Sequence, residues 1–91
     1  MLKIQRSANG EVVFALIGRI GPENVAELRE LFAAENKGRR IVLDLKDLTL
    51  ADRDAVAFLA GCETDGMKLA NCPAYVREWI LRLREARSLR P

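Results

Sequence analysis

The 91-residue sequence contains no histidine and few hydroxyl side chains: two serines, two threonines and one tyrosine. Nucleophilic catalysis by a Ser-His-Asp or Cys-His arrangement needs an imidazole, so both arrangements are excluded. Zinc sites that use histidine are excluded for the same reason. Carboxylates, lysines and two thiols remain, and this inventory favours a non-catalytic protein without cofactor or metal.

Cysteines and long apolar runs are also scarce. Cys62 and Cys72 lack the Cys-x-x-Cys spacing of a redox or metal motif, so we expect reduced thiols. Cys72 stands next to a predicted helix start, where the helix dipole can lower a thiol pKa, so it is either a redox sensor or a small packed residue. The longest apolar run, Val12–Ile17, is too short to span a membrane, and residues 1–6 lack an apolar signal region. We therefore expect a cytoplasmic protein without membrane insertion.

The net charge of +2 is unevenly distributed along the chain. Residues 77–90 carry five arginines and two glutamates, which leaves residues 1–76 with a charge of −1. Because the charges near the C-terminal end are mixed in sign and lack aromatic stacking partners, a solvated helix face is the favoured interpretation. Nucleic acid is therefore not an expected partner.

The first twenty residues predict a β-hairpin. Residues 2–6 alternate apolar and polar side chains, as in a strand with one buried face. Asn9-Gly10 predicts a tight turn because both residues tolerate positive φ, so the next strand should run antiparallel to the first. That strand, residues 12–17, is apolar at every position, from which we expect coverage on both of its faces.

The rest of the chain alternates amphipathic helices with short apolar strands. Pro22 suits the first position of a helix whose apolar face carries Val25, Leu28, Leu31 and Phe32. Asp52 is the expected N-cap of a second helix. The predicted order is strands at 2–6 and 12–17, a helix from 22 to about 38, a strand at 41–45, a helix from 52 to 66, a strand at 67–69 and a helix from 73 to 90.

This β-β-α-β-α-β-α order predicts an α/β fold with one domain over residues 1–91. The sheet should have four mostly parallel strands, with the first strand antiparallel. Loops at the carboxyl ends of parallel strands gather along one edge, where ligands and partners usually bind. We expect that edge to collect Arg19, residues 48–54 and residues 71–73.

Three aspartates could serve as metal ligands or as an acid–base pair. Asp52 and Asp54 are two positions apart, which on a helix directs their side chains about 200° away from each other. Capping and interaction with the helix dipole are the favoured interpretation. Asp44 interrupts an apolar strand, and we expect it to make a structural hydrogen bond at the end of the strand.

Three segments together resemble a STAS domain, the module shared by anti-sigma factor antagonists and the cytoplasmic tails of sulfate transporters. They are Gly18–Ile20 before an amphipathic helix, the strand-to-helix segment 41–56, and Gly66–Pro73. The resemblance covers about residues 10 to 83 and implies a fold that matches the element order above.

The start of the second helix departs from the motif of this family. In phosphorylatable antagonists it reads Asp-Ser-Ser-Gly, and a kinase-like anti-sigma factor phosphorylates the second serine. The corresponding residues here are Asp52, Arg53, Asp54 and Ala55, so three of the four positions differ. A serine kinase cannot phosphorylate Asp54. Its carboxylate imitates phosphoserine only in part, because it carries one charge and two oxygens instead of nearly two charges and three.

These departures leave two hypotheses for the domain. Either Asp54 locks it in a phosphorylated-like state, or the surface serves a different partner. Arg53 places a large cation where the family has a small hydroxyl, so it obstructs the usual docking face, serves an acidic partner, or is solvated without a role.

The resemblance implies a bacterial protein-interaction module in signal transduction and transcription regulation, without the phosphoserine switch. Its expected partner is a protein, such as a kinase-like anti-sigma factor, and a homodimer is left open. The alternative is an accessory subunit of a transporter or a small-ligand sensor. The residues assigned to partner binding are Arg19, Thr49, Asp52, Arg53, Asp54 and Ala55.

Overall fold

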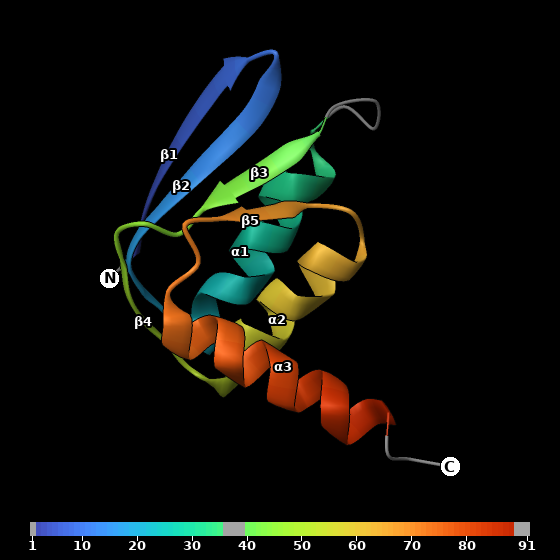
Figure 1. Ribbon diagram of the computed structural model, residues 1–91. Helices are drawn as coiled ribbons and strands as arrows, with labels where there is room; N and C mark the ends of the chain where they lie inside the picture. The colour runs from blue at the N-terminus through green and yellow to red at the C-terminus, as the bar shows by residue number, and fades with distance from the viewer. Residues whose placement is uncertain (1, 36–39, 89–91) are drawn as a thin grey trace.

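The computed structural model describes residues 2–35 and 40–88, which form a mixed β-sheet and three helices (Figure 1). The elements are β1 (Leu2–Asn9), β2 (Glu11–Ile20), α1 (Pro22–Ala33), β3 (Ile41–Asp44), β4 (Leu48–Ala51), α2 (Arg53–Thr64), β5 (Lys68–Ala70) and α3 (Ala74–Ser88). The α/β class, the antiparallel first strand and the helices after the later strands are confirmed. Gly38, the predicted end of the first helix, lies outside the described residues, and α1 ends at Ala33.

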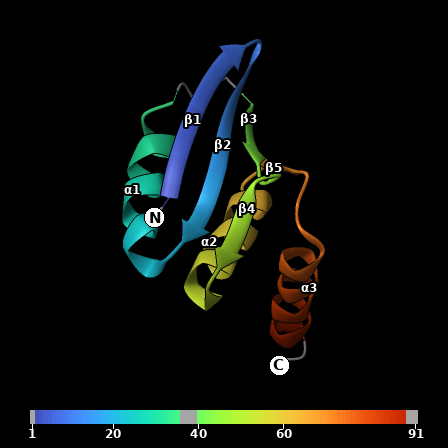
Figure 2. The same ribbon diagram turned by 90° about the vertical axis from the view of Figure 1, so that its left-hand side faces the viewer.

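The sheet has the strand order β1-β2-β3-β5, and only β1 runs antiparallel to its neighbour. The chain reverses between β1 and β2 at Gly10, whose φ of 90° explains the need for glycine there. In the strand order, β3 follows β2 and β5 follows β3, so the crossover connections β2-α1-β3 and β3-α2-β5 run in the same direction across the sheet. Because such crossovers are right-handed, α1 and α2 lie on the same face of the sheet, behind the strands in Figure 2.

A fifth short strand, β4, adds to the four that the sequence predicts. β2 pairs with β3 through residues 12–15 and with β4 through residues 18–20. The change of partner coincides with a bulge between Gly18 and Arg19, and Gly18 has a φ of 98°. Residues 48–51 therefore extend the sheet before α2 begins.

In the part of the chain that the structure describes, helices cover one face of the sheet only, so the expectation that both faces of residues 12–17 are covered is wrong. Val12, Phe14 and Leu16 are fully buried, whereas Val13, Ala15 and Ile17 between them are half-buried. Alternate residues of a strand point to opposite faces, and both helices use the same one. Val42 on β3 pairs with Val13 and is buried outside the main core, so small apolar residues cover one another on the open face.

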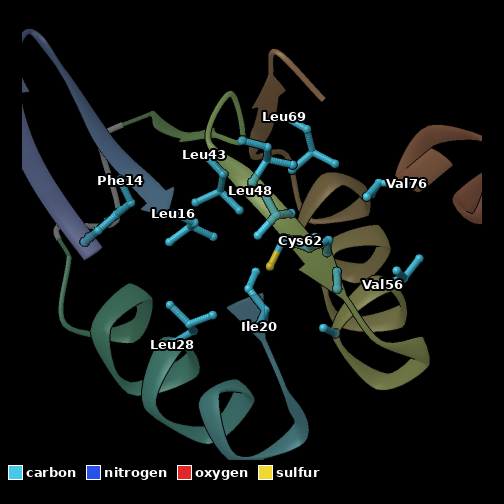
Figure 3. Close-up of a cluster of buried hydrophobic side chains, with 14 of the residues drawn as sticks. Phe14, Leu16, Ile20, Leu28, Leu43, Leu48, Val56, Cys62, Leu69 and Val76 are labelled. Atoms are coloured by element: carbon cyan, nitrogen blue, oxygen red, sulfur yellow. The ribbon is translucent and has the colours of Figure 1, made fainter. Parts of the chain in front are cut away.

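The core lies between the sheet and the two helices, as the side chains in Figure 3 show. Phe14 contacts Phe32 of α1, with 5.1 Å between ring centroids, and Phe32 in turn stacks on Phe58 of α2 at 5.9 Å. Leu28 and Phe32 are the buried residues of α1, as their helical spacing predicts. In the part of the chain that is described, no helix has the length and apolar character that crossing a membrane requires.

α3 packs against α2 through apolar and ionic contacts. Val76 and Ile80 are fully buried, while Trp79 is only half-buried. Glu63 of α2 accepts two hydrogen bonds from Arg77 and one from Arg84, each 2.8 Å long. Two arginines near the C-terminal end, Arg77 and Arg84, therefore attach α3 to α2.

Candidate partner-binding surface

The candidate surface is built where β2 and β4 end and α2 begins. Arg19 of β2 stands beside Leu50 of β4 in the parallel register. The Thr49 hydroxyl donates a hydrogen bond to the carbonyl of Gly18 over 2.9 Å, and the Asp52 N–H donates to the carbonyl of Ile20 over 3.4 Å. These bonds fix β4 and the N-cap of α2 against the end of β2. The structure thus brings together the predicted residues from Arg19 to Asp54.

Asp52 is the N-cap of α2, as predicted. Its backbone is extended and its Oδ1 accepts a hydrogen bond from the N–H of Ala55 over 2.9 Å. Ala55, which the sequence assigned to partner binding, is fully buried in the core and its N–H is used by the cap, so the structure does not place it on the exposed surface. The carboxylate of Asp52 therefore stabilises the start of α2.

Replacing Asp52 by Ala should lower the free energy of unfolding by about 1 kcal/mol, because the N–H of Ala55 loses its partner. Asp52→Asn should keep most of that stability, since the amide oxygen can accept the same bond. Urea unfolding followed by circular dichroism measures both changes. Equal destabilisation by Ala and Asn would contradict a capping role.

Three charged side chains surround this start of α2. Arg19, Arg53 and Asp54 are all exposed. Among the described residues, none of the three forms an ion pair or a side-chain hydrogen bond. Asp54 lies in the first turn of α2, where a negative charge interacts favourably with the helix dipole. Charges without internal partners are available to an external one.

Leu50 is a surface residue that the sequence prediction missed. Its side chain is 47% exposed, although a strand with a period of two would bury it together with Leu48, which is buried. In β4 the buried positions are Leu48 and Ala51 instead. Gly18 pairs with Leu48 and Arg19 with Leu50, so Thr49 is an extra residue of β4 and the register shifts there. The apolar pattern of residues 48–51 does not reveal this shift.

The segment 71–73 is connected to a different part of the edge. The side-chain amide of Asn71 donates to Asp44 at the end of β3 over 3.1 Å, and the same Oδ1 accepts from the N–H of Lys46 over 3.0 Å. The structural hydrogen bond expected for Asp44 is thus confirmed. In the described chain no three acidic or thiol groups come together as metal ligands.

The two thiols lack the electrostatic surroundings of a reactive cysteine. Burial raises the pKa of Cys62 to about 12, with a further rise from Asp65 that Arg29 partly opposes. Burial also raises the pKa of Cys72, and Arg77 only partly offsets it. Cys72 also packs against the core, so packing and the raised pKa together favour the packed-residue interpretation over the sensor.

Comparison with known proteins identifies the fold. No family model matches the sequence, and no curated protein does. The structure of the anti-sigma factor antagonist SpoIIAA in its unphosphorylated form is similar, with a TM-score of 0.54 and 15% sequence identity. The match covers 92% of this chain and 98% of that one. The chain therefore has a STAS-like fold, in agreement with the resemblance of its sequence segments.

Proposed function

We propose that this STAS-like chain is a non-catalytic interaction module of the anti-sigma antagonist type, which binds a protein partner through the surface at the start of α2. The observation that carries the proposal is Leu50, an exposed apolar side chain next to Arg19 and to the unpaired charges that begin α2. An apolar contact surrounded by charged groups is the usual anatomy of a protein interface. A kinase-like anti-sigma factor is the partner that the fold favours.

The proposed module works without a phosphoserine switch. Asp54 occupies the phosphoacceptor position and presents a permanent charge to the partner. Arg53 beside it is exposed and free to contact an acidic group of the partner. Regulation by phosphorylation at this helix start is therefore replaced by a fixed charge pattern.

Leu50→Asp should weaken binding to the partner at least tenfold, because a carboxylate in an apolar contact must lose its water. Isothermal titration calorimetry against each kinase-like anti-sigma factor of the host organism measures this change. Leu81→Asp is the matched control, since Leu81 is 49% exposed but lies on α3. Loss of binding in both variants, or in neither, would contradict the proposed surface, and absence of any binding factor would contradict the proposed partner class.

A further inference from the structure

A groove of about 940 Å³ runs between α1 and α2 on the outer side of the helical layer. Its lining is mainly apolar and includes Val25, Phe32, Phe58 and Met67. The exposed apolar side of the groove is formed partly by small residues, Ala26 and Ala33 on α1 and Ala57 and Gly61 on α2, and the exposed charged residues of the lining are Arg29, Asp54 and Asp65. Small residues on facing helices allow another helix backbone to approach closely.

The charges of the groove define the chemistry of its occupant. Asp54 and Asp65 lie in its lining eleven residues apart along α2, a separation of about 16 Å on a helix. Within the described chain, neither carboxylate has an ion pair or a side-chain hydrogen bond. Arg29 lies between the two helices, with its guanidinium 5.6 Å from the centroid of the Phe58 ring. The lining therefore carries two carboxylates and one cation, a net charge of −1, and the carboxylates complement an occupant with two positive charges about three turns apart that leaves Arg29 uncovered by cations.

Gly61 supplies an independent observation. It lies within α2, where glycine destabilises a helix relative to alanine. A Cβ atom added there would meet nothing within 4 Å, so no contact inside the described chain requires glycine. Gly61 lines the groove, and nothing inside the described chain requires a glycine there. This fits a position that the backbone of a binding partner approaches closely.

We propose that this groove binds an amphipathic basic helix of a protein partner, with its apolar stripe along Ala57 and Gly61 and its cations at Asp54 and Asp65. Helix-in-groove recognition uses apolar residues at i, i+3, i+4 and i+7 in this way. Because Asp54 also belongs to the surface at the start of α2, the inference rests on the proposed function and extends the contact along α2.

The test uses a fluorescent synthetic peptide helix of 18 residues with a leucine and alanine stripe and lysines eleven positions apart. Fluorescence anisotropy should show saturable binding, and Gly61→Leu should weaken it at least tenfold while leaving the melting temperature unchanged or higher. The Asp54→Asn/Asp65→Asn variant should also weaken it, whereas Glu85→Gln, an exposed carboxylate of α3, should not. A peptide with glutamates in place of the lysines should bind at least tenfold more weakly.

Equal binding of the lysine peptide to the Gly61→Leu variant, or of both peptides to the unaltered chain, would overturn the inference. Sedimentation equilibrium of the protein alone separates another occupant: self-association that Gly61→Leu abolishes would assign the groove to a second copy. An anti-sigma factor that binds Gly61→Leu as tightly as the unaltered chain would overturn the groove and leave the proposed function standing. Binding of the peptide by a chain that binds no anti-sigma factor would overturn the proposed function and leave the groove standing.

Discussion

The Arg53→Ser/Asp54→Ser double variant should accept phosphate from a kinase-like anti-sigma factor and ATP, whereas the unaltered chain should accept none. The structure already holds the start of α2 in place through the Asp52 cap, and position 54 is exposed in the first turn. Both replaced side chains are exposed, so the substitutions should change stability by no more than about 0.5 kcal/mol. The double substitution therefore supplies the hydroxyl that position 54 lacks without disturbing the capped start of α2.

Radiolabelled ATP and mass spectrometry of the phosphorylated peptide measure the outcome. Arg53→Ser alone is the matched control and should remain unlabelled, because it restores no acceptor at position 54. The native hydroxyls offer no substitute there, since Ser7 lies on β1, Ser88 ends α3, and the Thr49 hydroxyl donates to the Gly18 carbonyl. Phosphate on the unaltered chain at the start of α2 would contradict the loss of the switch. A double variant that binds the kinase but stays unlabelled would contradict the assignment of position 54.

Most of the fold was predictable because the relevant signals are local. The Asn9-Gly10 turn, the Asp52 cap and the apolar spacing of α1 each depend on residues close together in the sequence, and the structure confirms all three. The hydrogen bonding of Asp44 was also predictable, because a carboxylate that ends an apolar strand needs a donor. Local rules were sufficient for these features.

The features that sequence reasoning missed depend on tertiary context. An unbroken apolar strand can be covered on both faces or packed against apolar neighbours on an open face, and β2 takes the second course. The exposure of Leu50 depends on how β4 pairs with β2, some thirty residues away in the sequence, where the register shifts by one residue at Thr49. The pKa of Cys72 depends on its burial, which outweighs its position beside a helix start. The groove between α1 and α2 likewise exists only once the two helices pack together.

Replacing Glu63 by Gln should lower the free energy of unfolding at neutral pH by about 2 kcal/mol. Glu63 joins α2 to α3 through a bidentate contact with Arg77 and a third hydrogen bond from Arg84. Its side chain is only 24% exposed, so these charge-assisted bonds are less screened than those of a fully exposed pair. Glutamine keeps the size of the side chain but loses the charge and one acceptor oxygen. Urea denaturation at pH 7 measures the loss.

The Glu78–Arg82 pair provides the matched control for this substitution. It joins a carboxylate to an arginine over 2.7 Å within α3, and the side chains are 65% and 73% exposed. Glu78→Gln should therefore cost no more than about 0.5 kcal/mol, as expected of an exposed i, i+4 pair. Equal losses in the two variants would contradict a special role for Glu63. A double-mutant cycle with Arg77→Met isolates the part of the loss that comes from the pair itself.

The pH dependence distinguishes loss of charge from loss of packing. The hydrogen bond from Arg77 is the main reason that the pKa of Glu63 lies below its ordinary value, with Arg84 adding to the effect and burial opposing it. The folded chain thus binds the Glu63 proton less readily than the unfolded chain, so stability from this group is complete above the unfolded pKa of about 4.3. It is lost as the pH falls through the lower folded value. The stability difference between the unaltered chain and Glu63→Gln should therefore be constant above about pH 5.5 and shrink below about pH 4. A difference that stayed constant down to pH 3 would show that packing of the side chain, and not its charge, holds α3 to α2.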